Sequence, residues 1–420
     1  MMSVLPRETE SKKREERKGE KTYPRRILLA VITPLWKHKR MGASCSLPDG
    51  SELKGPDERV SQEVLVRANV ALVFVKPQAA TEAGVKFVRE RLEAVDGLCI
   101  LGDCGMEGDG IKAGNFVDQH YAEIAERALR TDPSDLVLGD AEKKTFAETY
   151  GVEYEVACEE HCVLNAQEYA VKFGSEEFPL AAKDLAQLWD SVPEKVKVAS
   201  GAYVCRVRGG GSDDLDDDME DVPPVFVVNG FYPLLKAKFE AKDAKIRLFV
   251  VAFDPKILTW ADFRRNVIGA TNPDKAAPGS LRADILENFE ALGIREPPNT
   301  TDNGVHGSAG PLEALKERIL WLNFDKCADP TGSKLSELAL WDPSTKSLLD
   351  DLLQNPIVDS NLLGGGSEWA LASSKKAFDL TEDKDTPDLY ALANNLAFAK
   401  HLQAIATPPT VVPPAAATTA

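Results

Sequence analysis

The run VALVFV at residues 70–75 is the strongest indication of fold in this chain of 420 residues. Every position in it is apolar, its length suits a single strand, and it stops at Lys76-Pro77. A continuous apolar run of this length predicts a buried β-strand. Thr81 follows, where it is placed to cap a helix whose apolar residues recur at helical spacing as far as Val95.

The hydrophobic pattern continues on both sides of this strand. A short strand is expected at residues 27–32, within an otherwise poorly structured leader. The further expected elements are strands within residues 98–101, 195–207 and 246–253, and helices at residues 117–129, 180–189, 232–239, 260–268 and 311–322. The length of the chain leaves room for two to three ordinary domains.

The composition is that of a soluble globular protein, with 43% hydrophobic and 28% charged residues. The net charge of −17 argues against nucleic acid as a partner, because phosphate backbones are recognised with an excess of Lys and Arg. A local group of cations within an acidic protein still suits a nucleotide. The seven cysteines have no regular spacing, so we expect a reducing compartment and no disulfide framework.

The N-terminal region resembles neither a membrane span nor a targeting peptide. Its apolar run at residues 27–36 is too short to cross a bilayer and is interrupted by Pro34. The preceding residues 8–26 carry more acids than a signal or transit peptide would. We therefore expect a cytoplasmic protein without a membrane span, and organelle import stays open.

Two short stretches have a metal site as their alternative interpretation. Cys158, His161 and Cys162 lie close together, but no second ligand pair follows at metal-finger spacing. The sequence GGG at residues 209–211, followed by DDLDDD at 213–218, predicts a flexible and solvated link. A calcium site in this acidic run would need alternating acids and a fixed turn.

The hexapeptide NGVHGS at residues 303–308 places His306, one of five histidines, in a turn-prone setting. The glycines on either side let a phosphate approach the imidazole without a side chain in the way. An imidazole is largely unprotonated near neutral pH and is then a competent nucleophile. The alternative is a hydrogen-bonded turn residue with no chemistry.

The chain also carries cations and polar residues, before and after His306, of the types that bind phosphate groups. They are Lys76, Tyr121, Arg265, Thr271, Arg282, Asn303, Ser308 and Glu317. Phosphoryl transfer needs positioning and charge neutralisation more than other covalent chemistry, and these residue types supply both. Taken singly, each of them could be a surface or capping residue.

Four motifs, in their order along the chain, resemble those of nucleoside diphosphate kinases. They are VKP at residues 75–77, VIGATNP at 267–273, PGSLR at 278–282 and NGVHGS at 303–308. The segment GFYPLL at residues 230–235 is similar to the lid segment of that family. The resemblance implies an α+β fold, a ferredoxin-like sandwich with a four-stranded antiparallel sheet and helices on one face.

The resemblance also implies a role for each site residue. His306 would carry the phosphoryl group, Glu317 would orient it, and Ser308 would support that pair. The nucleotide contacts would come from Lys76, Arg265, Thr271 and Arg282 on the phosphates, Asn303 on the ribose, and Phe231 and Leu235 on the base. Tyr121 would lie beside the transferred group. Mg²⁺ would arrive with ATP or another nucleoside triphosphate, bridging its phosphates without a protein cage.

The motifs cover under half of the chain, so the resemblance implies added segments. The expected division is a leader at 1–66, a nucleoside diphosphate kinase-like domain at 67–130 and 227–323, an inserted module at 131–208, a link at 209–226, an extension at 324–406 and a disordered tail at 407–420. The insertion falls between the two helices that close over the nucleotide in the family. A long insertion there leaves both helix ends in place, because loop-closure entropy grows slowly with length.

Three local departures accompany the insertion. The path from Arg282 to His306 is longer than in the family, Gln78-Ala79-Ala80 replaces the usual Asp-Gly, and Ala309-Gly310 replaces Asp-Ser. None of these changes removes a group assigned to phosphate binding. A homo-oligomer, and a protein partner bound through the insert, are further expectations.

The sequence therefore predicts a nucleoside diphosphate kinase that transfers the γ-phosphoryl group through phosphohistidine on His306. The alternative is a catalytically weak or silent nucleotide-binding scaffold that docks partners through its insert and extensions. A protein kinase acting through phosphohistidine, or a nucleic-acid processing activity, is a third class that nothing in the sequence specifically supports.

Overall fold

The computed structural model describes residues 67–174, 180–199, 201–207, 225–339, 345–358 and 375–406. The leader with its expected strand at 27–32, the acidic run of the link and the C-terminal tail lie outside these residues. Within the described ranges, no helix combines the length and the apolar character that crossing a membrane requires.

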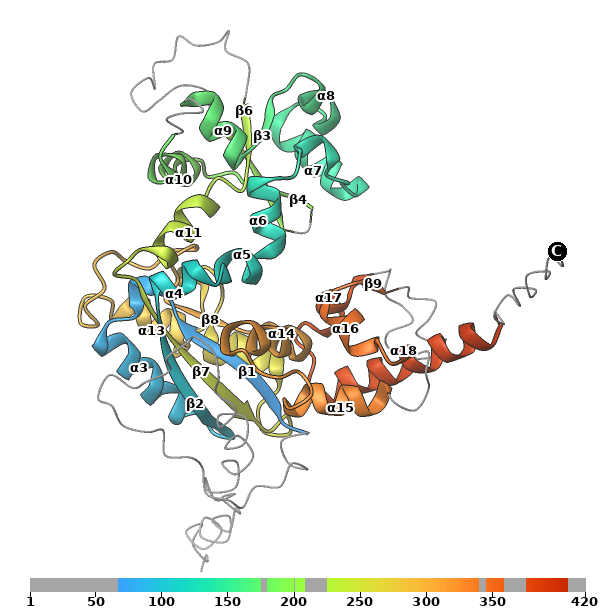
Figure 1. The fold of residues 1–420 in the computed structure, drawn as a ribbon. Coiled ribbons are helices and arrows are strands. Elements are labelled where there is room, and N and C mark those ends of the chain that lie inside the picture. The colour runs from blue at the N-terminus through green and yellow to red at the C-terminus, as the bar shows by residue number, and fades with distance from the viewer. Residues whose placement is uncertain are drawn as a thin grey trace, which may run out of the picture.

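A four-stranded antiparallel sheet forms the main domain, which consists of residues 67–130 and 229–323 (Figure 1). The strands lie in the order β2 (Leu98–Glu107), β7 (Lys245–Phe253), β1 (Asn69–Val75) and β8 (Val305–Gly307). By their order along the chain these strands are arranged 2-3-1-4, which is the ferredoxin-like arrangement. The predicted four-stranded antiparallel sheet is confirmed.

Helices cover both faces of this sheet, so the expectation of helices on one face is wrong. All seven residues of β1 are buried, and alternate positions belong to different cores: Leu72 and Phe74 face one, Ala71 and Val73 the other. A strand buried on both faces is apolar at every position, which explains the continuous run VALVFV.

The helices of the two layers come from distant parts of the chain. One layer holds α3 (Glu82–Glu93), α12 (Trp260–Asp262), the π-helix η3 (Phe263–Ile268) and α13 (Leu281–Glu287). The other holds α4 (Gly108–Ala113), α5 (Phe116–His120), α6 (Ala122–Leu129), α11 (Tyr232–Glu240) and α14 (Pro311–Leu322). The helix expected at 117–129 is thus broken at Tyr121, whose backbone (φ −99°, ψ 35°) is not helical.

Local capping explains where two of these helices begin and end. Thr81 accepts a hydrogen bond from Gly84 N (2.9 Å) at the start of α3, as its sequence position predicts. Pro311 occupies the first turn of α14, where the missing N–H costs nothing, and Asn323 closes that helix in the left-handed conformation.

The insert, residues 131–228, builds a second sheet of its own. The strand order is β3 (Val163–Asn165), β6 (Val225–Val228), β5 (Ala202–Val207) and β4 (Val196–Ala199). Because β6 pairs with β3 and β5, the sequence-based boundary at residue 227 falls inside a strand, and β6 belongs to the insert. The helices of the insert are α7 (Asp140–Tyr150), α8 (Tyr154–Glu159), α9 (Ala166–Phe173) and α10 (Ala182–Ser191).

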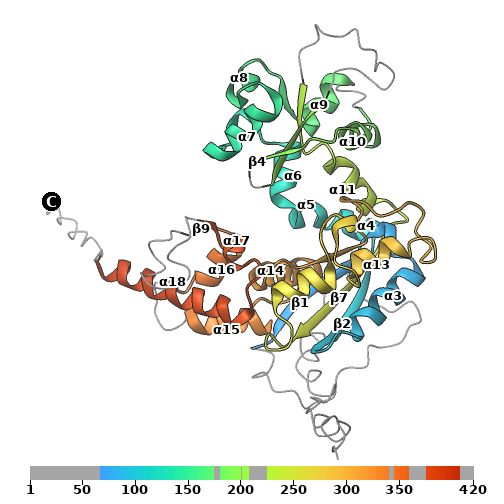
Figure 2. The same cartoon turned by 180° about the vertical axis from the view of Figure 1, so that it is seen from behind.

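The C-terminal extension packs on α14 rather than on the insert (Figure 2). Its helices are α15 (Pro330–Ala339), α16 (Leu348–Leu353), α17 (Ala377–Thr381) and α18 (Thr386–Ala406). Leu312 and Leu315 of α14 enter the apolar core of the extension, and Arg318 is paired with Asp329 at its start. The extension is therefore joined to the helix that follows the His306 strand.

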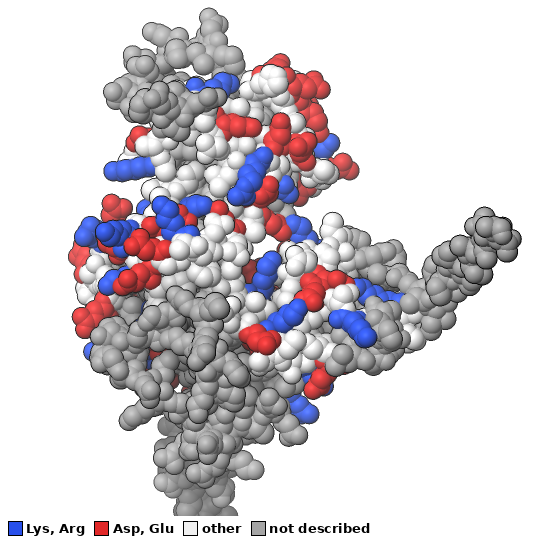
Figure 3. Space-filling view, viewed as in Figure 1, with Lys and Arg blue, Asp and Glu red and all other residues white. Residues whose placement is uncertain are grey.

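Charged side chains of both signs intermingle on the face of the molecule that Figure 3 shows. Acidic groups are frequent over the insert, in keeping with the net charge of −17. The cations that matter for a nucleotide therefore have to be sought locally, at the candidate site.

Candidate functional site

His306 lies in β8, directly across from Phe74 of the central strand β1. The two rings are stacked, with centroids 4.6 Å apart and planes 20° apart. The side chain of His306 retains 16% exposure, so one edge of the imidazole is open while its face is fixed by Phe74. The edge strand β8 thus presents His306 in one orientation.

Packing and backbone conformation restrict which residues could stand on either side of His306. Gly304 adopts φ +84°, and a Cβ there would lie 3.0 Å from Ile285. A Cβ on Gly307 would lie 2.7 Å from Ile268. A Cβ at either position is therefore opposed by close packing, and at Gly304 also by the left-handed backbone.

Glu317 of α14 fixes the orientation of the His306 ring. Its Oε1 lies 2.7 Å from His306 Nε2, and its Oε2 accepts a hydrogen bond from Ser308 Oγ (2.5 Å). Ser308 is itself held by β1, because its Oγ accepts from Leu72 N (2.9 Å). Glu317 is only 4% exposed, and this burial raises its pKa.

These bonds determine which ring nitrogen of His306 is free. With the Glu317 carboxylate as acceptor, Nε2 carries the proton and Nδ1 keeps its lone pair. Burial, followed by the charges of Lys76 and Arg282, lowers the pKa of His306 well below its ordinary value. The imidazole is therefore neutral, and Nδ1 is the ring nitrogen with a free lone pair.

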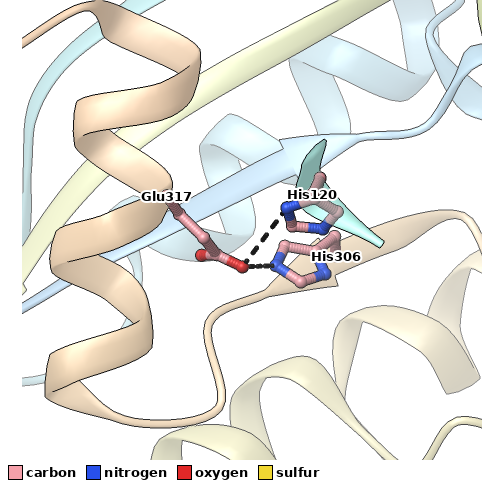
Figure 4. Close-up of side chains that lie close together, drawn as sticks. All are labelled: His120, His306 and Glu317. Carbon is pink, nitrogen blue, oxygen red and sulfur yellow. Dashed lines mark hydrogen bonds and ion pairs between the residues drawn. The ribbon is translucent and has the colours of Figure 1, made fainter. Parts of the chain in front are cut away.

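His120 is a site residue that the sequence analysis missed (Figure 4). Its ring stands edge-on to that of His306 at 4.6 Å, and its Nδ1 lies 3.7 Å from Glu317 Oε1. Trp321 Nε1 donates to that Nδ1 (3.1 Å), so the proton of the neutral ring is on Nε2. Burial lowers the pKa of His120 to about 3, which keeps a second positive charge away from His306.

Two cations predicted from the sequence come together beside His306. Lys76 is 7% exposed and donates to Thr301 O (3.0 Å). Burial, then the charge of Arg282, lowers the pKa of Lys76 to about 7. Arg282 donates to Val305 O (3.0 Å) and Gly269 O (2.9 Å), and burial lowers its pKa to about 10. Carbonyl oxygens thus hold both cations where an anion would bind.

Arg265 and Thr271 are placed less directly than expected. Both are exposed, and the third cation whose charge acts on His306 is Arg264, the preceding residue. Arg264 pairs with Glu382 (2.8 Å) and Asp383 (2.6 Å) of the C-terminal extension. Both arginines lie in the π-helix η3, whose wider turn changes which side chain faces the site.

Asn303 is 2% exposed and is fixed by hydrogen bonds from Nδ2 to Thr271 O (3.0 Å) and Thr300 O (3.3 Å). Its Oδ1 has no hydrogen-bond partner among the described residues. A buried acceptor without a donor is costly to a fold, so a donor from water or a bound group would stabilise it.

Tyr121, Phe231 and Leu235 lie on the broken helix and on α11. Tyr121 stands edge-on to His120 at 4.5 Å, and burial, then the charge of Glu317, raises the pKa of its hydroxyl. The ring of Phe231 packs against Trp189 of the insert, and Leu235 is 7% exposed within the core beside the sheet. The structure therefore brings Tyr121 to the histidine pair and places Phe231 at the boundary with the insert.

His120, His306 and Glu317 are also the group of side chains in the described ranges that could converge on a metal ion. Their candidate ligand atoms all lie within 4.8 Å of one another. Two of these atoms are engaged, His306 Nε2 with Glu317 and His120 Nδ1 with Trp321. Mg²⁺ prefers oxygen ligands, so this group does not suit it.

Curated nucleoside diphosphate kinases match part of the chain. The protein from Picosynechococcus sp. is 38% identical over 85 residues, which are 20% of this chain and 42% of that relative. The protein from Coxiella burnetii is 44% identical over 68 residues, which are 16% of this chain and 40% of that relative. The chain thus spans less than half the length of these relatives.

A solved structure is also similar to the chain, at a TM-score of 0.26 and 16% identity, covering 61% of this chain and 87% of that one. It is a transition-state mimic of nucleoside-diphosphate kinase from Borrelia burgdorferi with bound vanadate and ADP. No protein-family model matches the chain. The matched stretches, read with the strand order and the site, show a nucleoside diphosphate kinase-like domain within a longer chain.

Proposed function

We propose that the main domain is a nucleoside diphosphate kinase that works through phosphohistidine on His306. The observation that carries this proposal is the bond from His306 Nε2 to Glu317 (2.7 Å). It leaves Nδ1 unprotonated beside two cations, the buried Lys76 and the half-buried Arg282. A neutral, oriented imidazole facing positive charge is what attack on a phosphate requires.

The reaction has two matched halves. Nδ1 attacks the γ-phosphorus of a nucleoside triphosphate, an N–P bond forms, and the bond to the β,γ-bridging oxygen breaks. The nucleoside diphosphate leaves with that oxygen. A terminal oxygen of a second nucleoside diphosphate then attacks the phosphohistidine, and the imidazole is regenerated. No proton needs to leave the ring, because Nε2 keeps its proton and donates it in a hydrogen bond to Glu317. The Glu317 carboxylate stabilises the positive charge of the ring during transfer.

The surrounding side chains divide the binding of the nucleotide among them. Lys76 and Arg282 neutralise the phosphates, and an incoming phosphate would raise the pKa of Lys76 from about 7 and so charge it fully. We assign Arg265 and Thr271 to phosphates as well, since their exposed side chains are free to turn toward a ligand. Asn303 Oδ1 would accept from a ribose hydroxyl.

The remaining site residues act on the histidine and on the base. Tyr121 and Ser308 hold the neighbourhood of the His306–Glu317 pair. Phe231 would stack on the base, with Leu235 nearby. Stacking accepts any flat aromatic ring, so it discriminates little among the bases.

Mg²⁺ fits this site as a companion of the nucleotide. The side chains around His306 are cations and imidazoles, whereas Mg²⁺ takes oxygen ligands and usually keeps substrate phosphates among them. It would supply neutralisation of phosphate charge while the protein residues orient the chain of phosphates. Nucleoside di- and triphosphates are thus the proposed substrates, and action in the cytosol, a homo-oligomer and a partner on the insert rest on the sequence alone.

The proposal is tested by incubating the full chain with labelled ATP and measuring acid-labile, base-stable phosphate on histidine. We expect label on wild type, its transfer to an added nucleoside diphosphate, and its loss in His306→Gln. Glu317→Gln should retain the site but slow labelling on the order of 10²-fold. His161→Asn, an exposed histidine of the insert, is the matched control and should label as wild type does.

If wild type formed no phosphohistidine and transferred nothing, the kinase proposal would fail. A nucleotide-binding scaffold would then be the better description, provided that ADP still binds. Label that persisted in His306→Gln would assign the chemistry to another residue and overturn the role of His306.

A further inference from the structure

The insert reaches the main domain at the start of α11, the helix that carries Phe231. Helix α10 of the insert packs along α11, and the two lie side by side in both ribbon views (Figures 1 and 2). Trp189 of α10 is 4% exposed, and its ring lies 5.5 Å from that of Phe231 at a tilt of 52°. The aromatic residue proposed to hold the base is therefore in contact with a residue of the insert.

The contact is closely packed, and Gly230 makes it possible. A Cβ on Gly230 would lie 3.0 Å from Trp189 Cε3 and 3.5 Å from Leu185 Cδ1, both on α10. The indole therefore lies against the backbone just before Phe231 as well as against its ring. Glycine allows this approach, and a Cβ at this position would require the neighbouring side chains to shift by a few tenths of an ångström.

The rest of α11 is anchored within the main domain. Tyr232 donates to Asp118 (2.6 Å), Lys236 pairs with Asp118 (2.7 Å), and Lys238 pairs with Asp302 beside Asn303. These bonds hold the helix from its first turn onward. Phe231 precedes that turn, so its ring is the part of the lid segment that depends on the insert.

We propose that Trp189 is a positioning residue for Phe231, so that base binding by the main domain depends on the insert. This inference rests on the proposed function, because it takes Phe231 as the contact to the base. A ring that is already packed has less conformational freedom to lose when a base stacks on it. Removal of Trp189 leaves Phe231 several orientations and does not touch the His306–Glu317 bond.

The kinetic consequence is specific. Nucleotide affinity should fall while the rate of transfer at saturation stays, because the substrate loses a binding contact that is equally present before and during the reaction. We expect Trp189→Leu to raise the Kd for ADP about 3- to 10-fold, the range that follows from freeing one side chain. Trp189→Phe should restore most of the affinity, because it returns an aromatic neighbour.

The test is a double-mutant cycle on ADP binding to the full chain, measured by calorimetry, with Trp189→Leu, Phe231→Ala and the double variant. If Trp189 acts through Phe231, its substitution should have little further effect in the Phe231→Ala background. Gly230→Ala disturbs the same contact from the other side and should behave as Trp189→Leu does. Gly230→Ala can replace Trp189→Leu in the cycle if the latter variant does not fold.

Phe146→Leu is the matched control. Phe146 is fully buried in the insert but belongs to the core on the far side of the second sheet. It should leave the Kd for ADP unchanged. The inference is overturned if Trp189→Leu binds as wild type does, if its loss is the same without Phe231, or if Phe146→Leu causes an equal loss.

Binding is read without turnover, so this inference and the proposed function fail separately. Coupling between Trp189 and Phe231 without phosphohistidine would keep the inference and reject the kinase. Phosphohistidine on His306 without the coupling would keep the kinase and reject the role of Trp189.

Discussion

The insert and the C-terminal extension are both additions to the main domain, but different contacts attach them. The insert joins through apolar side chains, with Leu185 and Trp189 buried beside α11, and through uncharged hydrogen bonds of the buried Asn229 with Gly201 O (2.7 Å) and Tyr203 N (2.9 Å). The extension adds charged side chains to its apolar core. Arg318 and Asp329 pair there at 2.7 Å, and Asp385 accepts from Asn69 Nδ2 at 2.7 Å, across 316 positions of the chain.

The two additions also approach opposite sides of the site. The insert touches the lid segment, where the base would bind. The extension touches the turn after His306: Asp383 N donates to Ala309 O (3.0 Å), and Asp383 pairs with Arg264. Apolar burial and uncharged hydrogen bonds change little with pH, whereas the contribution of a titrating charge to stability changes with its protonation. The comparison teaches that the insert should govern affinity, and the extension the electrostatics near His306.

The largest expected effect is on the extension. Arg318 is fully buried, and its guanidinium holds both carboxylate oxygens of Asp329. Arg318→Met leaves that carboxylate buried without its cation, which should cost about 3–5 kcal/mol of unfolding free energy. Urea denaturation of the full chain measures it. Arg318→Met with Asp329→Leu should recover most of the loss, and a single variant as stable as wild type would contradict a charge-based attachment.

The second-largest loss of stability is expected from a change in the apolar attachment of the insert. Leu185 is 1% exposed on α10, so Leu185→Ala should cost about 2–4 kcal/mol through lost burial and the cavity left behind. The loss should be the same at low and high salt, unlike an ionic effect. Lys183→Ala, an exposed position on the same helix, should change stability by no more than about 0.5 kcal/mol. A strong salt dependence for Leu185→Ala would break the comparison.

A smaller effect is expected where the extension meets β1 and α12. Asp385 Oδ1 accepts from Asn69 Nδ2 and from Trp260 N (2.8 Å). Asp385→Ala leaves these donors without their acceptor and should cost about 1–3 kcal/mol, as followed by thermal unfolding. Asp385→Asn keeps an acceptor oxygen and should lose less. An equal loss in both would mean that the charge of Asp385, rather than its hydrogen bonds, matters.

A different kind of effect should appear as a pH dependence of stability at Glu313. Burial, then the charge of Glu317, raises the pKa of Glu313 from 4.5 to about 8. The folded state therefore binds the proton more tightly than the unfolded state does. The stabilising contribution is complete below about pH 4.5 and is lost as pH rises to about 8.

Glu313→Gln removes this dependence, so the variant should gain stability relative to wild type as pH rises from 5 to 8. The expected slope is below about 1.4 kcal/mol per pH unit, the limit for one proton. Denaturant titrations at several pH values measure it. Parallel curves for the two proteins would show that Glu313 titrates alike in the folded and unfolded states.

Much of the sheet was predictable from local sequence, whereas the residues of the central site were predicted from the resemblance of the motifs to those of nucleoside diphosphate kinases. VALVFV is β1, the helix expected at 311–322 is α14, and spacing along α14 brings Glu317 to His306. What local sequence does not contain is the break at Tyr121, which helix propensity alone does not require. That break turns His120 toward His306, so the second histidine could not be found from periodicity.

Two further differences between the sequence-based prediction and the structure arise from the pairing of distant strands and from the type of helix that forms. The sequence assigns Val225 and Phe226 to the link and Val227 and Val228 to the main domain, yet all four form one strand of the insert, which pairs in parallel with β3 far back in the chain. Arg264 and Arg265 are adjacent, and the π-helical turn decides which one lies near His306. Both outcomes depend on contacts that a single segment does not reveal.

The pairing of β1 with the segment around His306 also sets an order of events on the ribosome. Leu72 and Ser308 hydrogen-bond across 236 positions, so β1 emerges roughly 10 to 50 s before its partner at ordinary synthesis rates. During that interval its apolar edges have no native neighbour on that side, while the sheet of the insert can already close. The His306 site is therefore completed late in synthesis, and nascent chains stalled within the insert should expose β1 to chaperones.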